Sequence, residues 1–118
     1  MANSEVESSQ QRKQFANFVG QGRYEVNILT GALQGVLEPV GQKELLQGVR
    51  ERVRADKQDG LVPSYRITTS LVKATLGIMV DLKAVVNEEG KWGFTPMGQE
   101  VMDILNNHQT VMSKDYRL

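Results

Sequence analysis

The chain has 118 residues, with 14 Lys and Arg against 14 Asp and Glu, so its formal net charge is zero. This length suits one compact domain, and a composition of 40% hydrophobic and 24% charged residues excludes a disordered tail, a fibre and a membrane-spanning protein. The chain has no Cys and a single His, His108, which excludes disulfides, zinc fingers, cysteine nucleophiles and multi-histidine metal sites and is compatible with the cytoplasm, the location that we expect.

Residues 1–19 are predicted to be a polar N-terminal segment that contains a short amphipathic helix over about 5–19. The apolar residues of this helix recur at the i, i+3, i+4 spacing of one helix face: Phe15, Phe18 and Val19. Gly20 and Gly22 then end the helix. Because residues 1–14 lack the apolar stretch of a secretory signal peptide, we expect no export signal.

Two further helices are predicted over 24–36 and 42–55, with a Pro and a Gly between them. Both stretches repeat apolar residues mostly at steps of three and four, as one side of a helix does. In the first of them, Gly31 and Gly35 share a face. We interpret these two glycines as a place where another helix approaches closely.

A row of basic residues follows the polar side of the second of these helices. Separations of seven, four and three residues place them on roughly one helix face: Lys43, Arg50, Arg54 and Lys57. The row has two interpretations, a surface that neutralises phosphate groups or an ordinary solvated helix face. Glu44, Glu51 and Asp56 dilute its charge and favour the second interpretation.

A loop is predicted over about 56–64 from its Asp-Gly and Pro residues. The best-defined helix of the chain follows over 68–82, and either Thr68 or Ser64 is a suitable N-cap. One side of this helix is broadly apolar. The opposite side carries Arg66, Ser70, Lys73 and Gly77.

A β-hairpin is predicted from two short β-prone segments, 84–86 and 91–94, around a polar turn at 87–90. Trp92 and Phe94 alternate along the second strand, so both rings are expected on one side of the hairpin. We expect that side to pack in the core against the last helix.

The last helix is predicted to begin at Thr95-Pro96, with Thr as the N-cap and Pro in the first helical position. It is expected to end at about Asn107. Residues 108–118 show only a weak apolar pattern, so they are predicted to be a C-terminal tail that frays.

The predicted order of helix, helix, helix, two-stranded hairpin and helix resembles that of the winged helix-turn-helix superfamily. The likeness is strongest over about 66–105, where a helix, a strand, a glycine-containing turn and an aromatic strand lead through Thr95-Pro96-Met97-Gly98 into the closing helix. The resemblance implies a mainly α fold with a small β-hairpin. In detail, it implies a winged helix-turn-helix domain over 20–107 with an extra N-terminal helix and a C-terminal helix.

In that superfamily a recognition helix lies in the major groove of DNA with its N-terminal residues at base edges, and the wing contacts the adjacent backbone. The resemblance gives these roles to the helix at 68–82 and to the hairpin. With two bases from the row described above, the candidate DNA-binding residues are Arg50, Arg54, Arg66, Thr68, Thr69, Ser70, Lys73 and Lys91. Two features depart from the superfamily: Glu88-Glu89 at the wing tip, and a connection over 56–64 that is longer than a compact turn.

The expected function is that of a winged-helix transcriptional regulator that binds double-stranded DNA as a homodimer, with the amphipathic segments at 5–19 and 97–112 pairing with a second copy. The alternative is a winged-helix adaptor that binds a protein partner in a transcription or replication complex and does not contact DNA, which the zero net charge and Glu88-Glu89 favour. No nucleophile elbow, phosphate loop, metal-ligand cluster or convincing carboxylate pair is present, so we expect no enzyme activity and no cofactor.

Overall fold

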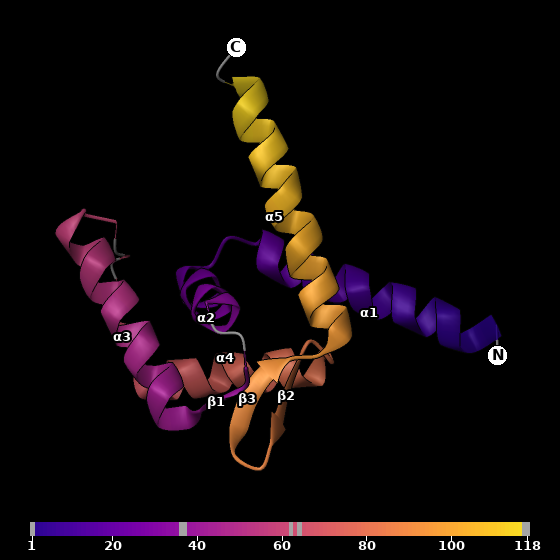
Figure 1. The fold of residues 1–118 in the computed structure, drawn as a ribbon, viewed down its shortest axis with the longest axis horizontal. Coiled ribbons are helices and arrows are strands. Elements are labelled where there is room, and N and C mark those ends of the chain that lie inside the picture. Colours follow the sequence, from indigo (N-terminus) through magenta and orange to yellow (C-terminus); the bar gives the residue numbers. More distant parts are fainter. Residues whose placement is uncertain (1, 36–37, 62, 64, 117–118) are drawn as a thin grey trace.

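In the part of the chain that the structure describes, five helices combine with one small antiparallel sheet (Figure 1). The computed structural model describes residues 2–35, 38–61, 63 and 65–116, and of these the side chains of residues 9–107. The elements are α1 (Ala2–Gly20), α2 (Tyr24–Gln34), β1 (Val40–Gly41), α3 (Gln42–Gln58), α4 (Thr69–Asp81), β2 (Val85–Glu88), β3 (Lys91–Phe94) and α5 (Pro96–Tyr116). The mainly α fold with a small β-hairpin is therefore as predicted. None of the described helices has the length and apolar character needed to cross a bilayer.

The β2–β3 hairpin lies where it is predicted, but its turn is tighter. The two turn residues, Glu89 and Gly90, have φ angles of 53° and 79°, and two positive φ values in succession are typical of a type I′ turn. Asn87 and Glu88, which are predicted to be turn residues, instead belong to β2. The side-chain oxygen of Asn87 accepts a hydrogen bond from the Gly90 N–H at 3.1 Å and closes the turn.

β1 is not among the predicted elements, because two residues are too few to show an alternating pattern. It pairs antiparallel with β3, with Val40 opposite Trp92, and the strand order of the sheet is β1-β3-β2. α3 begins directly after β1, at Gln42. The hairpin is therefore joined to the start of α3 through the sheet.

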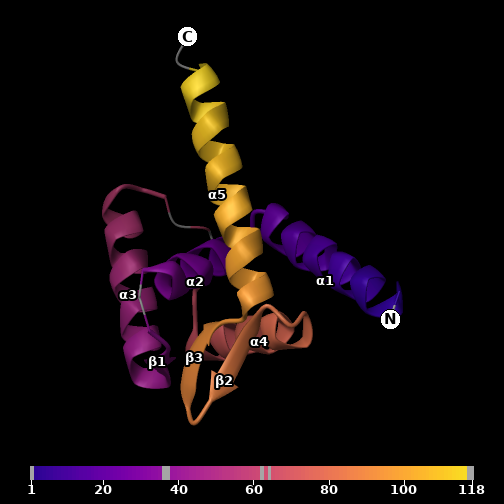
Figure 2. The same ribbon diagram turned by 45° about the vertical axis from the view of Figure 1, so that its right-hand side comes forward.

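The core lies between α2 and the elements around it. α2 contacts both α3 and α4 (Figure 2), and it buries one side that includes Leu29. Met79 of α4 and Phe15 of α1 are each 0% exposed in the same cluster. Trp92 and Phe94 are partly buried against this cluster, and β3 also contacts α5, as the alternation along β3 predicts.

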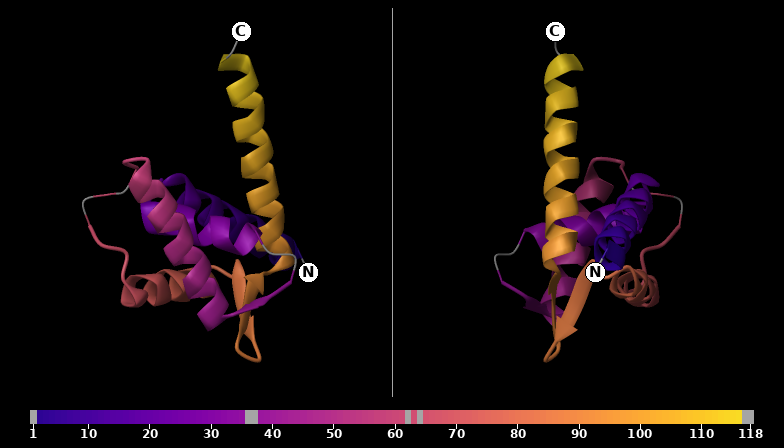
Figure 3. Two further views of the ribbon diagram at one scale, coloured as in Figure 1. Left: turned by 60° about the vertical axis from the view of Figure 1, so that its left-hand side comes forward. Right: turned by 90° about the vertical axis from the view of Figure 1, so that its right-hand side faces the viewer.

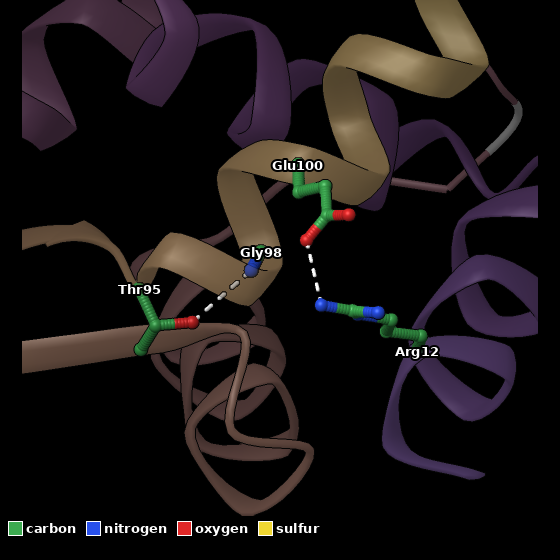
Figure 4. Close-up of polar contacts among 4 residues, drawn as sticks. All are labelled: Arg12, Thr95, Gly98 and Glu100. Carbon is green, nitrogen blue, oxygen red and sulfur yellow. Dashed lines mark hydrogen bonds and ion pairs between the residues drawn. The ribbon is translucent and has the colours of Figure 1, made fainter. Parts of the chain in front are cut away.

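α1 is a part of this core and confirms the predicted amphipathic helix, although it begins earlier, at Ala2. Phe15 and Phe18 are buried, and Arg12 forms an ion pair with Glu100 of α5 at 2.8 Å (Figure 4). α1 and α5 cross, and the N-terminal end of α1 and the C-terminal end of α5 project from the rest of the chain (Figures 1 and 2).

α5 is longer than predicted. It continues to Tyr116, so its predicted end at about Asn107 is wrong. No Gly or Pro follows Gly98 in the sequence, and without such a residue a helix has no local reason to end.

The junction between the hairpin and α5 depends on Thr95. Its Oγ1 accepts a hydrogen bond from the Gly98 N–H at 3.1 Å, which is the predicted N-cap (Figure 4). The same hydroxyl donates to the Lys83 carbonyl at 2.6 Å, and the Thr95 N–H donates to the Ala84 carbonyl at 2.9 Å. The cap is local to α5, and the other two bonds tie the start of α5 to the residues that directly follow α4.

The face of α2 that carries Gly31 and Gly35 receives an arginine side chain. A Cβ on Gly35 would lie 2.8 Å from one guanidinium nitrogen of Arg52, and a Cβ on Gly31 would lie 3.4 Å from the other. The two glycines were predicted to make room for the backbone of another helix. They instead make room for the side chain of Arg52, which belongs to α3. This cation lies near the C-terminal end of α2, where a positive charge is favourable.

Candidate functional site

A groove lies between the C-terminal half of α3 and the segment that leads back to α4. Figure 3 (left) shows the course of the chain through α3 and back to α4. It consists of two adjoining hollows of about 310 Å³ and 320 Å³, which share Val53, Lys57 and Ile67. We call it the α3 groove, and it is lined by Tyr24, Val49, Arg50, Val53, Arg54, Lys57, Pro63, Tyr65, Arg66 and Ile67. α3 runs to Gln58, three residues further than predicted, and this extension forms one end of the groove.

The charged residues that line the α3 groove are all basic. Arg50, Arg54 and Lys57 succeed one another at four and three residues along α3, and Arg66 lies on the other wall. Among the described side chains the only ion pair joins Arg12 and Glu100, so these four cations have no carboxylate partner there. The structure therefore brings together three of the predicted site residues and adds Lys57 to them.

Two tyrosine hydroxyls engage carboxylates at the margin of the groove. The Tyr24 hydroxyl donates to Asp56 at 2.6 Å, and the Tyr65 hydroxyl donates to Glu25 at 2.6 Å. The first bond joins α2 to α3, and the second fixes the segment before α4 to the start of α2. These carboxylates therefore accept hydrogen bonds from phenols instead of pairing with the cations of the groove.

Burial of the phenol, followed by its hydrogen bond to Asp56, raises the pKa of Tyr24 to about 12. The pKa of Tyr65 is also raised, chiefly by its hydrogen bond to Glu25. In both cases ionisation of the phenol would place a second negative charge beside a carboxylate and break the hydrogen bond.

The raised pKa of Tyr24 predicts a loss of stability in strong alkali. A folded-state pKa of about 12 lies above the ordinary value of 10.0, so the stabilisation is complete below pH 10.0 and disappears as the pH rises through about 12. We expect the difference in Tm between the wild type and Tyr24→Phe to shrink over this interval, as measured by circular dichroism. A difference that stays constant across the interval would show that Tyr24 does not titrate in this way.

α4 presents one exposed stripe to solvent. Its members recur at helical steps of three and four: Ser70, Lys73, Ala74, Gly77, Ile78 and Asp81. Ser70 and Lys73 are predicted site residues, and the exposed Thr69 lies beside them. Ala74 and Ile78 are not among the predicted site residues, although Ile78 is 42% exposed. Their spacing from Lys73 and Ser70 is the signal that identifies them as members of this face.

Thr68 serves as the N-cap of α4, as predicted. Its Oγ1 accepts a hydrogen bond from the Leu71 N–H at 3.1 Å, which satisfies one of the free N–H groups at the start of the helix. The hydroxyl keeps its proton and one further lone pair for another ligand. The other candidate cap, Ser64, lies outside the described residues.

Lys91 lies apart from the cations of the α3 groove. In the sheet it stands opposite both Glu88 and Gly41, and Gly41 immediately precedes the first residue of α3. The cations of the groove belong to the C-terminal half of α3 and to the segment before α4. The eight predicted site residues thus fall in three places: the α3 groove, the start of α4, and the hairpin.

Within the described residues, no group of three His, Cys, Asp or Glu side chains is placed to hold a metal ion. Comparisons with protein-family models, with curated proteins and with solved structures give no match. The function is therefore argued from the arrangement of charge and shape alone.

Proposed function

We propose that this chain is a winged-helix protein that binds double-stranded DNA through α4 and regulates transcription. The observation that carries the proposal is the exposed stripe of α4 on a helix whose other side is fixed in the core by Val72, Leu76 and Met79. A rigidly held helix with one exposed face that mixes polar and apolar groups is what a reader of the major groove requires.

The residues of the stripe suit base edges. Lys73 offers an ammonium group that can donate to guanine, and the Ser70 hydroxyl can donate or accept. Ala74 and Gly77 add almost no bulk, so the backbone of α4 can come close to the DNA. Ile78 supplies an apolar contact of the kind that suits a thymine methyl group.

In this proposal the hairpin is the wing. β1 ties it to the start of α3, and Thr95 ties its far end to α4, so the wing and α4 have a fixed relation. Lys91 is then the wing cation that meets the DNA backbone, and the two exposed acidic residues at the tip, Glu88 and Glu89, keep the tip itself away from phosphates.

The proposal includes a homodimer on a palindromic site. The crossed α1 and α5 project from the rest of the chain, and a second copy placed there would give the two-fold symmetry that such a site requires (Figures 1 and 2). Phe15 and Phe18 are already buried within the protomer, whereas Ile104 of α5 is exposed and available to a partner. We expect sedimentation equilibrium to give twice the chain mass of 13.2 kDa, and a single-chain mass would remove the dimer from the proposal.

Replacement of Lys73 tests the role of α4. We expect Lys73→Ala to weaken binding to a DNA duplex about 10-fold, because one contact from Lys to a base edge is lost. Lys13→Ala is the matched control, since it removes the same charge from an exposed position on α1. Fluorescence anisotropy with labelled duplexes measures both variants. Equal losses for the two, or none for Lys73→Ala, would contradict the role given to α4.

The second candidate function is a winged-helix adaptor, and the acidic wing favours it. A shallow hollow of about 960 Å³ lies along the hairpin, and its charged lining residues are Glu88, Glu89 and Lys91, which leaves a net negative charge. Such a surface suits a basic segment of a protein partner. An adaptor would bind no duplex even at low salt and would co-purify with one protein, and this separates it from the first proposal.

A further inference from the structure

We propose that the α3 groove binds phosphates of the DNA backbone beside the site contacted by α4, and so forms a second contact of this chain with the duplex. This inference rests on the proposed function, and it names the backbone phosphates as the part of the DNA that the groove binds. It assigns a role to the long connection before α4, which departs from a compact helix-turn-helix.

The charge of the groove favours an anionic ligand. Arg50, Arg54, Lys57 and Arg66 line it, and none of them has a carboxylate partner among the described side chains. Cations gathered in this way repel one another, and a row of anions removes that repulsion. Three of the four are Arg, whose planar guanidinium donates two parallel hydrogen bonds to one phosphate.

The spacing of the cations favours a ligand with a repeated negative charge. Arg50 and Lys57 are separated by about 10 Å along α3 at the rise of an α-helix. One strand of a duplex advances about 3.4 Å per phosphate along its axis, so the row on α3 spans about three phosphate-to-phosphate steps. A polymer with regularly repeated charge fits this row better than a single small anion does.

Hydrogen bonds fix the walls of the groove before any ligand binds. The bonds from Tyr24 to Asp56 and from Tyr65 to Glu25, both 2.6 Å, hold α2, α3 and the segment before α4 together. Val53 and Ile67 lie between the two walls as apolar floor. A site fixed before binding loses less entropy when it binds its ligand.

The test compares the salt dependence of DNA binding between variants. The double variant Arg54→Gln/Arg66→Gln removes one cation from each wall, and Arg50→Gln/Lys57→Gln removes the other two. For each bound chain, each double variant is expected to reduce the magnitude of the slope of log affinity against log salt by about 1.8, and to weaken binding roughly 60-fold at about 100 mM salt. Lys83→Gln, at an exposed position between α4 and β2, is the control and should leave the slope within measurement error. Circular dichroism melting confirms that each variant is folded.

The outcomes separate the two proposals. A reduced slope in both double variants supports the groove as a phosphate site. If the wild type binds the duplex and both double variants keep its slope, the groove inference is overturned and DNA binding stands. If the wild type binds no duplex at low salt, both proposals are wrong. Binding of poly-glutamate that the variants lose, with duplex binding unchanged, would assign the groove to an acidic protein instead.

Discussion

Phe15→Ala is expected to lower the free energy of unfolding by about 4 kcal/mol, because a large aromatic ring is deleted from a fully packed site. Phe15 is 0% exposed although it lies in the first helix of the chain, on a segment whose composition is mostly polar. A loss of this size is a large fraction of the total stability of an ordinary domain. Urea unfolding followed by circular dichroism measures it.

Gln14→Ala is the matched control for this prediction, since residue 14 is exposed on the same helix. We expect it to change the free energy of unfolding by less than about 0.5 kcal/mol. If Phe15→Ala has an equally small effect, α1 is an appendage and not part of the core. The prediction therefore tests whether residues before Tyr24 are required for the fold.

Gly98→Ala is expected to lower the free energy of unfolding by about 3 kcal/mol. A Cβ at this position would collide with the carbonyl oxygen of Ala84 and would lie 2.9 Å from its carbon. That carbonyl is backbone and cannot rotate away, because it accepts the hydrogen bond from the Thr95 N–H. Either α5 moves away from the hairpin or the bonds at Thr95 break.

Gly77→Ala is the control for the glycine substitution. Gly77 is also helical, but a Cβ there would meet no atom within 4 Å. We therefore expect it to raise the free energy of unfolding by about 0.5 to 1 kcal/mol, through the higher helix propensity of Ala. Thermal and urea unfolding of the pair should move in opposite directions. A shared direction would contradict the packing described around Gly98.

The collision at Gly98 gives a physical reason for one part of the sequence resemblance. Thr95 and Pro96 begin the helix, and Gly98 follows because the backbone of Ala84, directly before β2, comes too close for any side chain. The motif can be read from the sequence, but the reason for its glycine depends on Ala84, fourteen residues earlier. A contact between residues that are distant in the sequence cannot be predicted from the local spacing of residues.

Elements with a clear helical period could be predicted, whereas those defined by tertiary contact could not. The apolar spacing of Phe15 and Phe18 was sufficient to place α1, and Thr68 was sufficient to place the start of α4. β1 could not be predicted because its only signal is its pairing with β3. Similarly, the spacing of Gly31 and Gly35 predicted a neighbouring helix on that face of α2. Only the folded chain shows that the Arg52 guanidinium lies there.

The candidate site could be predicted only in part for the same reason. Arg50, Arg54 and Lys57 form a row in the sequence, and a row alone does not distinguish a binding surface from a solvated face. In the folded chain Arg66 lies on the opposite wall of the groove from this row. The Asp56 carboxylate accepts a hydrogen bond from Tyr24 and does not pair with the row. Both effects depend on the path of the chain between α3 and α4, which composition does not determine.

The most direct test of DNA binding is the affinity of the wild-type protein for a labelled random-sequence duplex of about 20 base pairs, a length of about two helical turns. Fluorescence anisotropy should detect binding at about 50 mM salt. The four groove cations of a single chain alone predict an affinity at least about 100-fold lower at about 200 mM, and a second bound chain makes the fall steeper. No binding at the lower salt concentration, or an affinity that does not change with salt, would contradict the account.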